Sequence, residues 1–227
     1  MMRRREFLFL SGSSIAGLPA LTAAAQSAPG PASPESEIDP NAFRFAIISD
    51  LTGGERPGVF DDAVAKLNML RPEFVMSVGD LIEGYTGDEA ELVRQWEAFD
   101  ARAGQLTMPF FYVPGNHDIS GPFPVSEEVW RKRYGPTYYS FVHKGALFLC
   151  LNTEDPPRED NWSAISDDQL AMIRRAIDEN PDPRWVFVFM HRPVWADCHE
   201  ARPDLWEPIA TLLQDLSLIH ISEPTRP

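Results

Sequence analysis

The sequence has little cysteine and no excess of positive charge. Its 227 residues include two cysteines, and 20 Lys and Arg residues stand against 34 Asp and Glu residues, which gives a net charge of −14. A protein that binds the nucleic-acid backbone needs a basic face, so this composition argues against such binding. An anionic substrate would have to be attracted by something other than the overall field, for which a bound metal ion is the obvious candidate.

The sequence also lacks a hydrophobic run long enough to cross a membrane. The apolar stretch of residues 15–25 is short and is interrupted by Gly17 and Pro19, so we expect no stable membrane anchor. It follows a basic start and ends in small residues, which predicts an export signal over residues 1–25. Residues 4–8, "RREFL", are similar to the twin-arginine signature that exports folded proteins, with an ordinary secretory signal as the alternative. We therefore expect a periplasmic or secreted bacterial protein.

Export would change both the charge and the redox surroundings of the chain. Removal of residues 1–25 takes away three Arg and one Glu, so the mature part carries −14 − 2 = −16. The two cysteines would then stand in an oxidising compartment. Cys150 lies inside the apolar run "ALFLCLN", which favours a buried free thiol, and a disulfide with Cys198 is the alternative.

The remaining chain divides into a leader and one domain. Residues 26–42 are rich in Pro, Ser and Ala, which predicts a flexible leader. Over residues 43–215, apolar runs alternate with amphipathic segments, as is typical of an α/β domain whose helices cover a mostly parallel sheet. The predicted strands are 43–49, 73–79, 108–113, 138–142, 146–152 and 185–190. The predicted helices are 59–70, 88–104 with a capping pair of Thr86 and Glu89, and 166–180 with one of Ser166 and Gln169.

The last segment of the chain has an unusual origin. Residues 216–226, "LSLIHISEPTR", match the translation of a common transposon-type sequencing adapter without interruption. We therefore predict that residues 216–227 are not native and that the natural protein continues differently beyond Asp215, with a coincidental tail as the alternative. On this interpretation His220 takes no part in any site.

Polar side chains follow four of the predicted strands. Asp50 ends the first run, Asp80 follows Gly79 after the second, residues 116–118 (Asn-His-Asp) follow the third, and His191 follows the last. In open α/β sheets, ligands bind beyond the carboxyl ends of the strands, so we expect these groups at one edge of one sheet. Oxygen ligands with an added imidazole suit divalent Mn, Fe or Zn. Taken singly, each residue could instead be a turn former, a helix cap or an interior histidine.

These residues and their order resemble the calcineurin-like metallophosphoesterase superfamily. The pattern of that family is Asp-x-His, Gly-Asp, Gly-Asn-His followed by Asp or Glu, a His after a strand, and Gly-His-x-His. Asp50, Gly79-Asp80, Gly115–Asp118 and His191 match in this order, and the resemblance covers residues 43–215. It implies an αββα sandwich in which two β-sheets are flanked by helices, here with its C-terminal strands missing.

The resemblance implies a set of metal ligands. Asp50 would bind a first ion, and Asp80 would bridge two ions. Asn116 and His191 would bind the second ion. The cofactors would be two divalent ions, and the implied reaction is attack on the phosphorus of a phosphate ester by a metal-bound hydroxide.

The resemblance also implies two catalytic residues. His117 would face the substrate, where it would donate to a phosphate oxygen or protonate the leaving group. Asp118 would hold the imidazole of His117 in the useful tautomer.

Two departures from the family pattern bear on the metal site. Thr52 stands where the family has the His of Asp-x-His, which would weaken the first metal site and leaves a one-metal site open; Thr52 could equally cap the turn before Gly53-Gly54. No Gly-His-x-His stands before Asp215, so we expect an incomplete site and an inactive chain.

The leading prediction is an exported metallophosphoesterase that acts on small phosphate esters. A non-catalytic binding protein on the same fold is the alternative that Thr52 favours, and a phosphodiesterase is a third candidate. Arg56 and Arg192 could clamp a phosphate, although a solvated surface role is the simpler interpretation for each. Trp195 and the loop around Phe123 could line a pocket or simply pack.

Overall fold

The computed structural model describes residues 39–52, 55–119, 122–157, 163–194, 203–213 and 218–222. The predicted export signal, most of the predicted leader, Trp195 and Cys198 lie outside these residues. Within them, no helix combines the length and the apolar character that crossing a bilayer requires.

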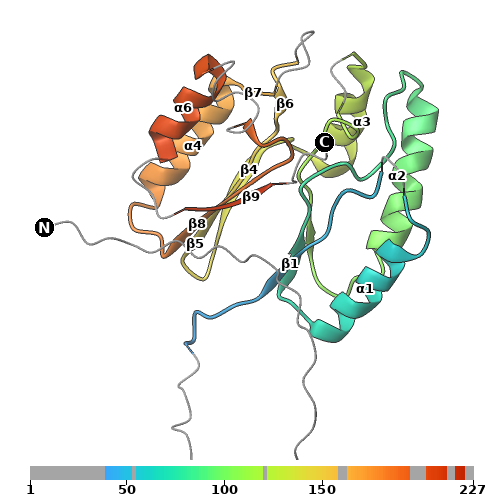
Figure 1. The fold of residues 1–227 in the computed structure, drawn as a ribbon, viewed down its shortest axis with the longest axis horizontal. Helices are drawn as coiled ribbons and strands as arrows, with labels where there is room; N and C mark the ends of the chain where they lie inside the picture. Colours follow the sequence, from blue (N-terminus) through green and yellow to red (C-terminus); the bar gives the residue numbers. More distant parts are fainter. Residues whose placement is uncertain are drawn as a thin grey trace, which may run out of the picture. The chain divides into compact units, whose positions relative to one another are not determined.

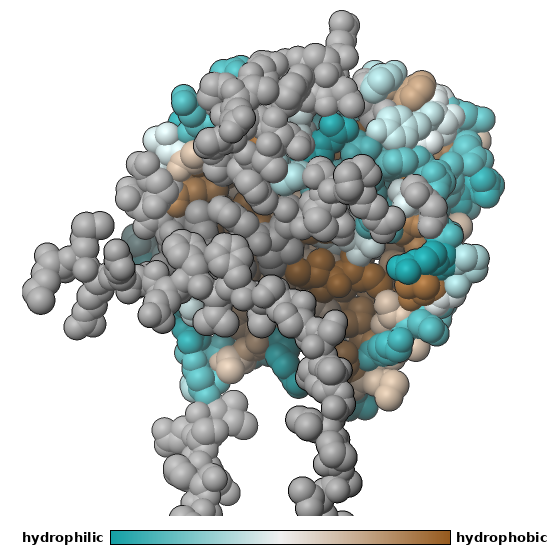
Figure 2. Space-filling view, in the orientation of Figure 1, coloured by the Kyte–Doolittle hydropathy of each residue, from teal (hydrophilic) through white to brown (hydrophobic). Residues whose placement is uncertain are grey.

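The first sheet consists of three short parallel strands in the order β1-β2-β3. These are β1 (Phe45–Ile47), β2 (Phe74–Met76) and β3 (Phe110–Phe111). Helices α1 (Val59–Leu70), α2 (Glu89–Ala103) and α3 (Val125–Tyr134) pack on its outer face around the buried indoles of Trp96 and Trp130 (Figure 1). In Figure 2 the surface over α2 and α3 is mainly hydrophilic, whereas hydrophobic residues gather between β1 and α1.

The second sheet has the strand order β4-β5-β8-β9. Its strands are β4 (Tyr139–His143), β5 (Ala146–Cys150), β8 (Trp185–Met190) and β9 (Leu218–Ser222). The β4–β5 pair is antiparallel, and the β5–β8 and β8–β9 pairs are parallel. Helices α4 (Asp167–Glu179) and α6 (Pro203–Leu213) cover its outer face (Figure 1). A separate parallel pair, β6 (Glu154–Asp155) and β7 (Ala164–Ile165), follows β5.

The inner faces of the two sheets share an aromatic core. The rings of Phe45 and Phe187 lie 5.2 Å apart, and those of Phe74 and Phe148 lie 5.5 Å apart, so each pair joins the first sheet to the second. Such edge-on aromatic contacts add to the hydrophobic stabilisation that burial provides. The predicted α/β class and the αββα sandwich are confirmed. The prediction of a single edge of a single sheet is wrong, because His191 follows β8 of the second sheet.

Local contacts explain where helices α2 and α4 begin. Ser166 caps α4 as predicted, since its hydroxyl accepts a hydrogen bond from Gln169 N at 3.4 Å. The Gln169 side chain does not complete the predicted pair, because its amide bonds to the Asn152 backbone. For α2 the predicted pair of Thr86 and Glu89 is wrong, because Asp88 is the N-cap and accepts from the amides of the first turn. The Thr86 hydroxyl instead accepts from the backbone amide of Asp88, the residue directly before the first helical residue Glu89.

Five elements were not predicted from the sequence: α3, β6, β7, α6 and β9. Helix α3 is short and polar outside its buried Trp130 and Val129, so its apolar periodicity is weak. Strand β9 falls in the segment predicted to be adapter-encoded and pairs along β8 from Val186 to Met190. An edge strand offers a row of backbone donors and acceptors to an incoming segment, and backbone pairing depends little on the identity of the side chains.

Candidate metal and phosphate site

An aspartate with left-handed backbone conformation follows each of the first two strands. Asp50 has φ of 58° and Asp80 has φ of 56°. Aspartate tolerates this region better than most residues, and such conformations gather at functional sites. The two loops are joined through their backbones, because Leu51 N donates to the Asp80 carbonyl at 2.9 Å and Asp50 N donates to the Gly79 carbonyl at 3.2 Å.

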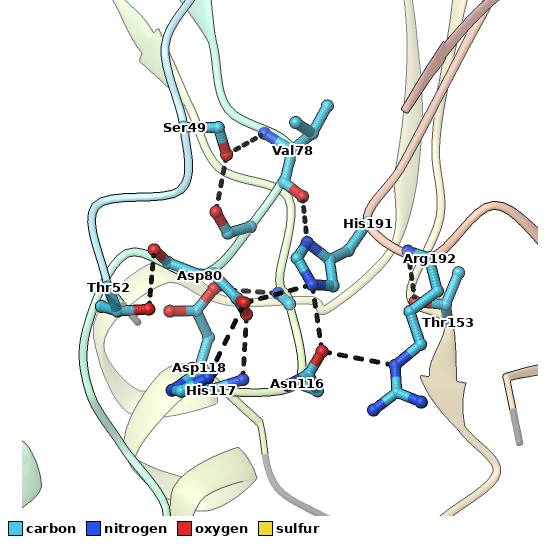
Figure 3. A network of polar contacts seen from close by, with 12 residues as sticks. Ser49, Thr52, Val78, Asp80, Asn116, His117, Asp118, Thr153, His191 and Arg192 are labelled. Atoms are coloured by element: carbon cyan, nitrogen blue, oxygen red, sulfur yellow. Dashed lines mark hydrogen bonds and ion pairs between the residues drawn. The ribbon is translucent and has the colours of Figure 1, made fainter. Parts of the chain in front are cut away.

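Side chains from both sheets converge beside Asp80 (Figure 3). His191 Nε2 lies 3.3 Å from Asp80 Oδ2 and 3.0 Å from Asn116 Oδ1. The Asp80 and His191 side chains are about one-tenth exposed, at 11% and 9%. We call Asp80, Asn116 and His191 the cradle. Its members follow β2, β3 and β8, so the cradle exists only because the two sheets pack face to face.

The tautomer of His191 is set by the backbone. Its Nδ1 lies 2.8 Å from the Val78 carbonyl, which can only accept, so Nδ1 carries the proton. In neutral His191 the lone pair of Nε2 therefore faces two oxygen atoms. Metal-binding histidines are commonly oriented in this way by a carbonyl on the other ring nitrogen.

The electrostatics of the cradle favour a positive charge between its three atoms. Burial tends to raise the pKa of Asp80, but His191 outweighs it and holds that pKa below its usual range. Burial tends to lower the pKa of His191, but Asp80 outweighs it and the pKa is raised. A proton on Nε2 would be donated to the two oxygen atoms, and a cation in its place would bind the two oxygens and Nε2, which is the competition expected at a metal site.

The cradle fits a divalent cation by its donor set. One carboxylate oxygen, one amide oxygen and one imidazole nitrogen suit Mn, Fe or Zn. Among the residues that the structure describes, no three His, Cys, Asp or Glu side chains form a metal-binding group by themselves. A cation at the cradle would therefore need the Asn116 amide as a ligand.

The backbone of Asp50 is hydrogen-bonded to the loop that carries Asp80. The Asp50 side chain lines a neighbouring hollow of about 400 Å³, together with Thr52, Glu55 and Arg56 at the start of α1. The Thr52 hydroxyl donates to the Asp80 carbonyl at 3.4 Å, and its amide donates to the same oxygen at 3.3 Å. Thr52 thus ties the first loop to the second.

His117 lies at the rim of the cradle, with 22% of its side chain exposed. Its backbone amide donates to Asp80 Oδ1 at 3.0 Å, and its Nδ1 donates to the Glu83 carbonyl at 2.7 Å. Nε2 is the outer nitrogen and lies 3.9 Å from Asp80 Oδ2. This leaves Nε2 as the atom that could exchange a proton with a substrate.

The predicted role of Asp118 is wrong. Its carboxylate is fully buried and accepts from Leu81 N at 2.8 Å, Ile82 N at 3.2 Å and Gly115 N at 2.8 Å. The His117 imidazole bonds to the Glu83 carbonyl instead. Burial, followed by the nearby Asp80, raises the pKa of Asp118 to about 7. The Asp118 carboxylate therefore joins the loop after β2 to the loop after β3 through hydrogen bonds to the backbone of both.

Glycine permits the close approach of these two loops. A Cβ on Gly115 would overlap Asp80 Oδ1 and would stand 3.0 Å from His191 Cγ. Gly79, with φ of 101°, lies directly against the Gly115 backbone. The glycines of the Gly-Asp and Gly-Asn-His motifs therefore make room for the cradle.

Two residues beside the cradle, Tyr85 and Glu154, escaped the sequence predictions. Asn116 Nδ2 donates to the Tyr85 hydroxyl at 2.7 Å, and Arg192 Nε donates to Asn116 Oδ1 at 3.3 Å. Arg192 also pairs with Glu154 at 3.0 Å, and with 16% of its side chain exposed it does not have the predicted solvated surface role. The rule that selected Asp50, Asp80 and His191, namely a polar residue shortly after an apolar strand, would also have selected Glu154 if it had been applied to the strand at 146–152.

The other tentative site residues stay outside the cradle. Arg56 is exposed at the hollow beside Asp50, and Phe123 is half-buried before α3. The nearest atom to a Cβ placed on Gly87 would be Cδ1 of Phe123 at 3.5 Å, so this ring packs on the loop before α2.

The chain is similar to several curated proteins. The human serine/threonine-protein phosphatase CPPED1 is 31% identical over 158 residues, which is 63% of this chain and 47% of that protein. A probable glycerophosphodiester phosphodiesterase GpdQ of Arcobacter nitrofigilis is 22% identical over 123 residues, which is 54% of this chain and 42% of the relative. The chain thus spans about half the length of these curated relatives.

A solved structure shares the fold. A dimetal phosphatase from Danio rerio superposes with a TM-score of 0.60 at 16% identity, over 79% of this chain and 80% of the other. The family model for calcineurin-like phosphoesterases matches residues 43–221, which is most of the chain and includes every residue of the cradle. The chain therefore belongs to the calcineurin-like phosphoesterase family.

Proposed function

We propose that the chain forms part of a metal-dependent phosphoesterase that hydrolyses small phosphate esters. The observation that carries the proposal is the convergence of Asp80 Oδ2, Asn116 Oδ1 and His191 Nε2 on one point, with the His191 tautomer fixed. Family membership and the names of the relatives, a phosphatase and a phosphodiesterase, support the same class of reaction.

In this proposal the cradle holds one divalent ion, and Asp50 with Asp80 holds a second, weaker one. When bound, such ions lower the pKa of water and neutralise phosphate charge. The chain itself carries −14, so without them it would repel the substrate.

His117 is the proposed proton-transfer residue. Its Nδ1 proton is held by the Glu83 carbonyl, which fixes the ring and leaves Nε2 for the substrate. A proton on Nε2 would be donated to a phosphate oxygen or to the leaving group. The hollow of about 400 Å³ beside Asp50 would accommodate the rest of a small ester.

The direct test measures hydrolysis of 4-nitrophenyl phosphate and of bis(4-nitrophenyl) phosphate with added Mn²⁺. It is made on the 227-residue chain and on the protein read from the source gene beyond Asp215. We expect the gene-derived protein to hydrolyse at least one ester and to lose this activity in EDTA. Turnover of the monoester alone would assign a phosphatase, and turnover of the diester would assign a phosphodiesterase.

His117→Ala separates proton transfer from metal binding. We expect turnover to fall by a factor of about 10² to 10⁴, with Mn²⁺ content near that of the unaltered protein. His143→Ala, at a histidine paired with Glu73 away from the site, is the control. Loss of Mn²⁺ together with activity would instead make His117 a metal ligand.

A non-catalytic binding protein on the same fold is the second candidate. The observation in its favour is Thr52, whose hydroxyl is engaged with the Asp80 carbonyl where the family has a metal-binding histidine. If the gene-derived protein binds Mn²⁺ but hydrolyses neither ester, this candidate replaces the enzyme. Thr52→His should then tighten binding of the first ion, and unchanged affinity would show that residue 52 is not at a ligand position.

We further propose that the protein is exported, since residues 1–25 have the pattern of an export signal. Expression of the chain with Arg4→Lys and Arg5→Lys tests this, and export by the twin-arginine route should be lost. Export that is unaffected by both substitutions would indicate the ordinary secretory route.

A further inference from the structure

We propose that Tyr85 is a positioning residue that, together with Arg192, holds the Asn116 amide with its oxygen toward the metal. The inference rests on the function proposed above, because it concerns the same cradle. Asn116 Nδ2 donates to the Tyr85 hydroxyl at 2.7 Å, while Asn116 Oδ1 lies 3.0 Å from His191 Nε2 (Figure 3 shows the Asn116–His191 side).

The orientation of this amide decides whether a cation can bind. The last torsion of asparagine has two broad minima, so exchange of its oxygen and nitrogen costs little by itself. In the exchanged orientation the NH₂ group would donate to neutral His191 Nε2, which stabilises the cradle without metal and turns a positive end toward an incoming ion. A neighbouring group is therefore needed to hold the amide.

Two neighbours favour the orientation that can bind a cation. Arg192 Nε can only donate, and its bond to Asn116 Oδ1 at 3.3 Å disfavours the exchanged amide. A hydroxyl can donate or accept, so the Tyr85 hydroxyl, which accepts from Nδ2, fixes the place of the amide while Arg192 selects its orientation. The Tyr85 bond is the shorter of the two. Loss of the hydroxyl leaves the amide nitrogen without this acceptor.

The loop before Tyr85 is built to reach Asn116. Gly84 and Tyr85 both have left-handed conformation, with φ of 56° and 46°, and this is uncommon for a bulky residue such as tyrosine. Gly84 lies so close to the His117 carbonyl that a Cβ would overlap it, and its amide donates to Gln95 Oε1 of α2 at 2.8 Å.

Burial does not account for the strained conformation of Tyr85. The residue is 45% exposed, and its ring meets the ring of His117 edge-on at 4.7 Å. A residue with this exposure is not held by the hydrophobic core, so its bond to Asn116 is not forced by the core. Strain that burial does not offset points to a role in the site.

The experiment compares Tyr85→Phe with Tyr138→Phe in the 227-residue chain. Both changes remove one hydroxyl and keep the ring, and Tyr138 packs on the core beneath α4 and α6, away from the cradle. Calorimetric titration with Mn²⁺ alone should show affinity about 10-fold weaker for Tyr85→Phe, the lower end for loss of a group that orients a metal ligand. Tyr138→Phe should bind as the unaltered chain does.

A second measurement keeps the inference separate from the proposed function. The ¹⁵N resonance of the Asn116 side-chain amide, assigned with Asn116→Ala, should shift in metal-free Tyr85→Phe and stay in place in Tyr138→Phe. Equal Mn²⁺ affinity for Tyr85→Phe and the unaltered chain, or an unshifted resonance, overturns the role of Tyr85. An unaltered chain that binds no Mn²⁺ overturns the metal site, and the resonance then decides the role of Tyr85 alone.

Discussion

At the scale of single residues, the site depends on polar atoms that bond to the backbone of a neighbouring loop. Asp118 bonds to three backbone amides, Thr52 bonds to the Asp80 carbonyl, and His191 is oriented by the Val78 carbonyl. Each of these bonds replaces water for a group that is buried or nearly so. The geometry of the cradle therefore depends on hydrogen bonds between side chains and the backbone of neighbouring loops.

Asp118→Asn should lower the free energy of unfolding by about 1–3 kcal/mol, the usual cost of a buried group left without its partner. An asparagine could accept from Leu81 and Ile82, but its NH₂ group would then face the Gly115 amide, donor against donor. Urea denaturation measures the change, with Asp62→Asn at an exposed position of α1 as the control. Equal stability of the two variants would contradict the inference that the Asp118 carboxylate stabilises the contact between the two loops.

Cys150 should resist thiol reagents in the folded chain. Burial raises the pKa of its thiol to about 12, so at pH 8 the thiol keeps its proton and the reactive thiolate is scarce. With Cys198→Ser leaving Cys150 as the one thiol, a colorimetric disulfide reagent should react in guanidinium chloride and not in native buffer. Fast reaction in native buffer would mean that β5 opens to solvent.

At the scale of elements, loops and helix ends are fixed by short, specific contacts. The N-terminus of α2 is capped by Asp88, and the loops after β2 and β3 touch through Gly79 and Gly115. These contacts set where the strands end and hence where their side chains point.

Asp88→Ala should destabilise the chain by about 0.5–2 kcal/mol, because the side chain satisfies Ala90 N at 3.0 Å and Glu91 N at 3.3 Å. Thr86→Ala should cost less, since Thr86 bonds only to an amide that precedes the helix. Thermal unfolding monitored by circular dichroism compares the two. A larger loss for Thr86→Ala would restore the capping box predicted from the sequence.

Gly115→Ala should weaken Mn²⁺ binding by about 10-fold or more, because its methyl group would displace the Asp80 carboxylate and press on His191. The matched control is Gly87→Ala, whose methyl would make an ordinary contact of 3.5 Å with Phe123. Titration with Mn²⁺ measures both variants. Equal affinity would show that the two loops can separate without loss of the cradle.

At the scale of the whole molecule, two sheets with helices on their outer faces bring loops from distant parts of the chain to one place. Asp80 and His191 are 111 positions apart in numbering, yet their side chains lie 3.3 Å apart. A cation at the cradle would bind only the folded state, and binding would therefore be linked to stability.

Mn²⁺ at about 100 times its dissociation constant should raise the free energy of unfolding by about 2.7 kcal/mol, and EDTA should reverse the effect. Asn116→Ala should abolish the increase, because the cradle then lacks its amide oxygen. His143→Ala should preserve it, since His143 pairs with Glu73 elsewhere. A rise that survives Asn116→Ala would place the ion outside the cradle.

The sequence by itself determined the α/β class, most of the helices and strands, and the residues of the cradle. Apolar runs with polar residues directly after them are local signals, and helix α1 has the predicted bounds because its pattern is strong and its neighbours are turns. The family resemblance rests on the same short motifs, which is why it could be stated before any geometry.

Only the tertiary structure decided which groups face one another. Asp118 stands next to His117 in the sequence, but its side chain turns inward to the backbone of the loop after β2, so adjacency along the chain misled the assignment of its role. Tyr85 gave no local signal, because its contact to Asn116 joins the loops that follow β2 and β3. Arg192 reaches Asn116 only because the two sheets pack together. Short motifs encode which groups are available, whereas long-range packing sets the distances and orientations that decide what those groups do.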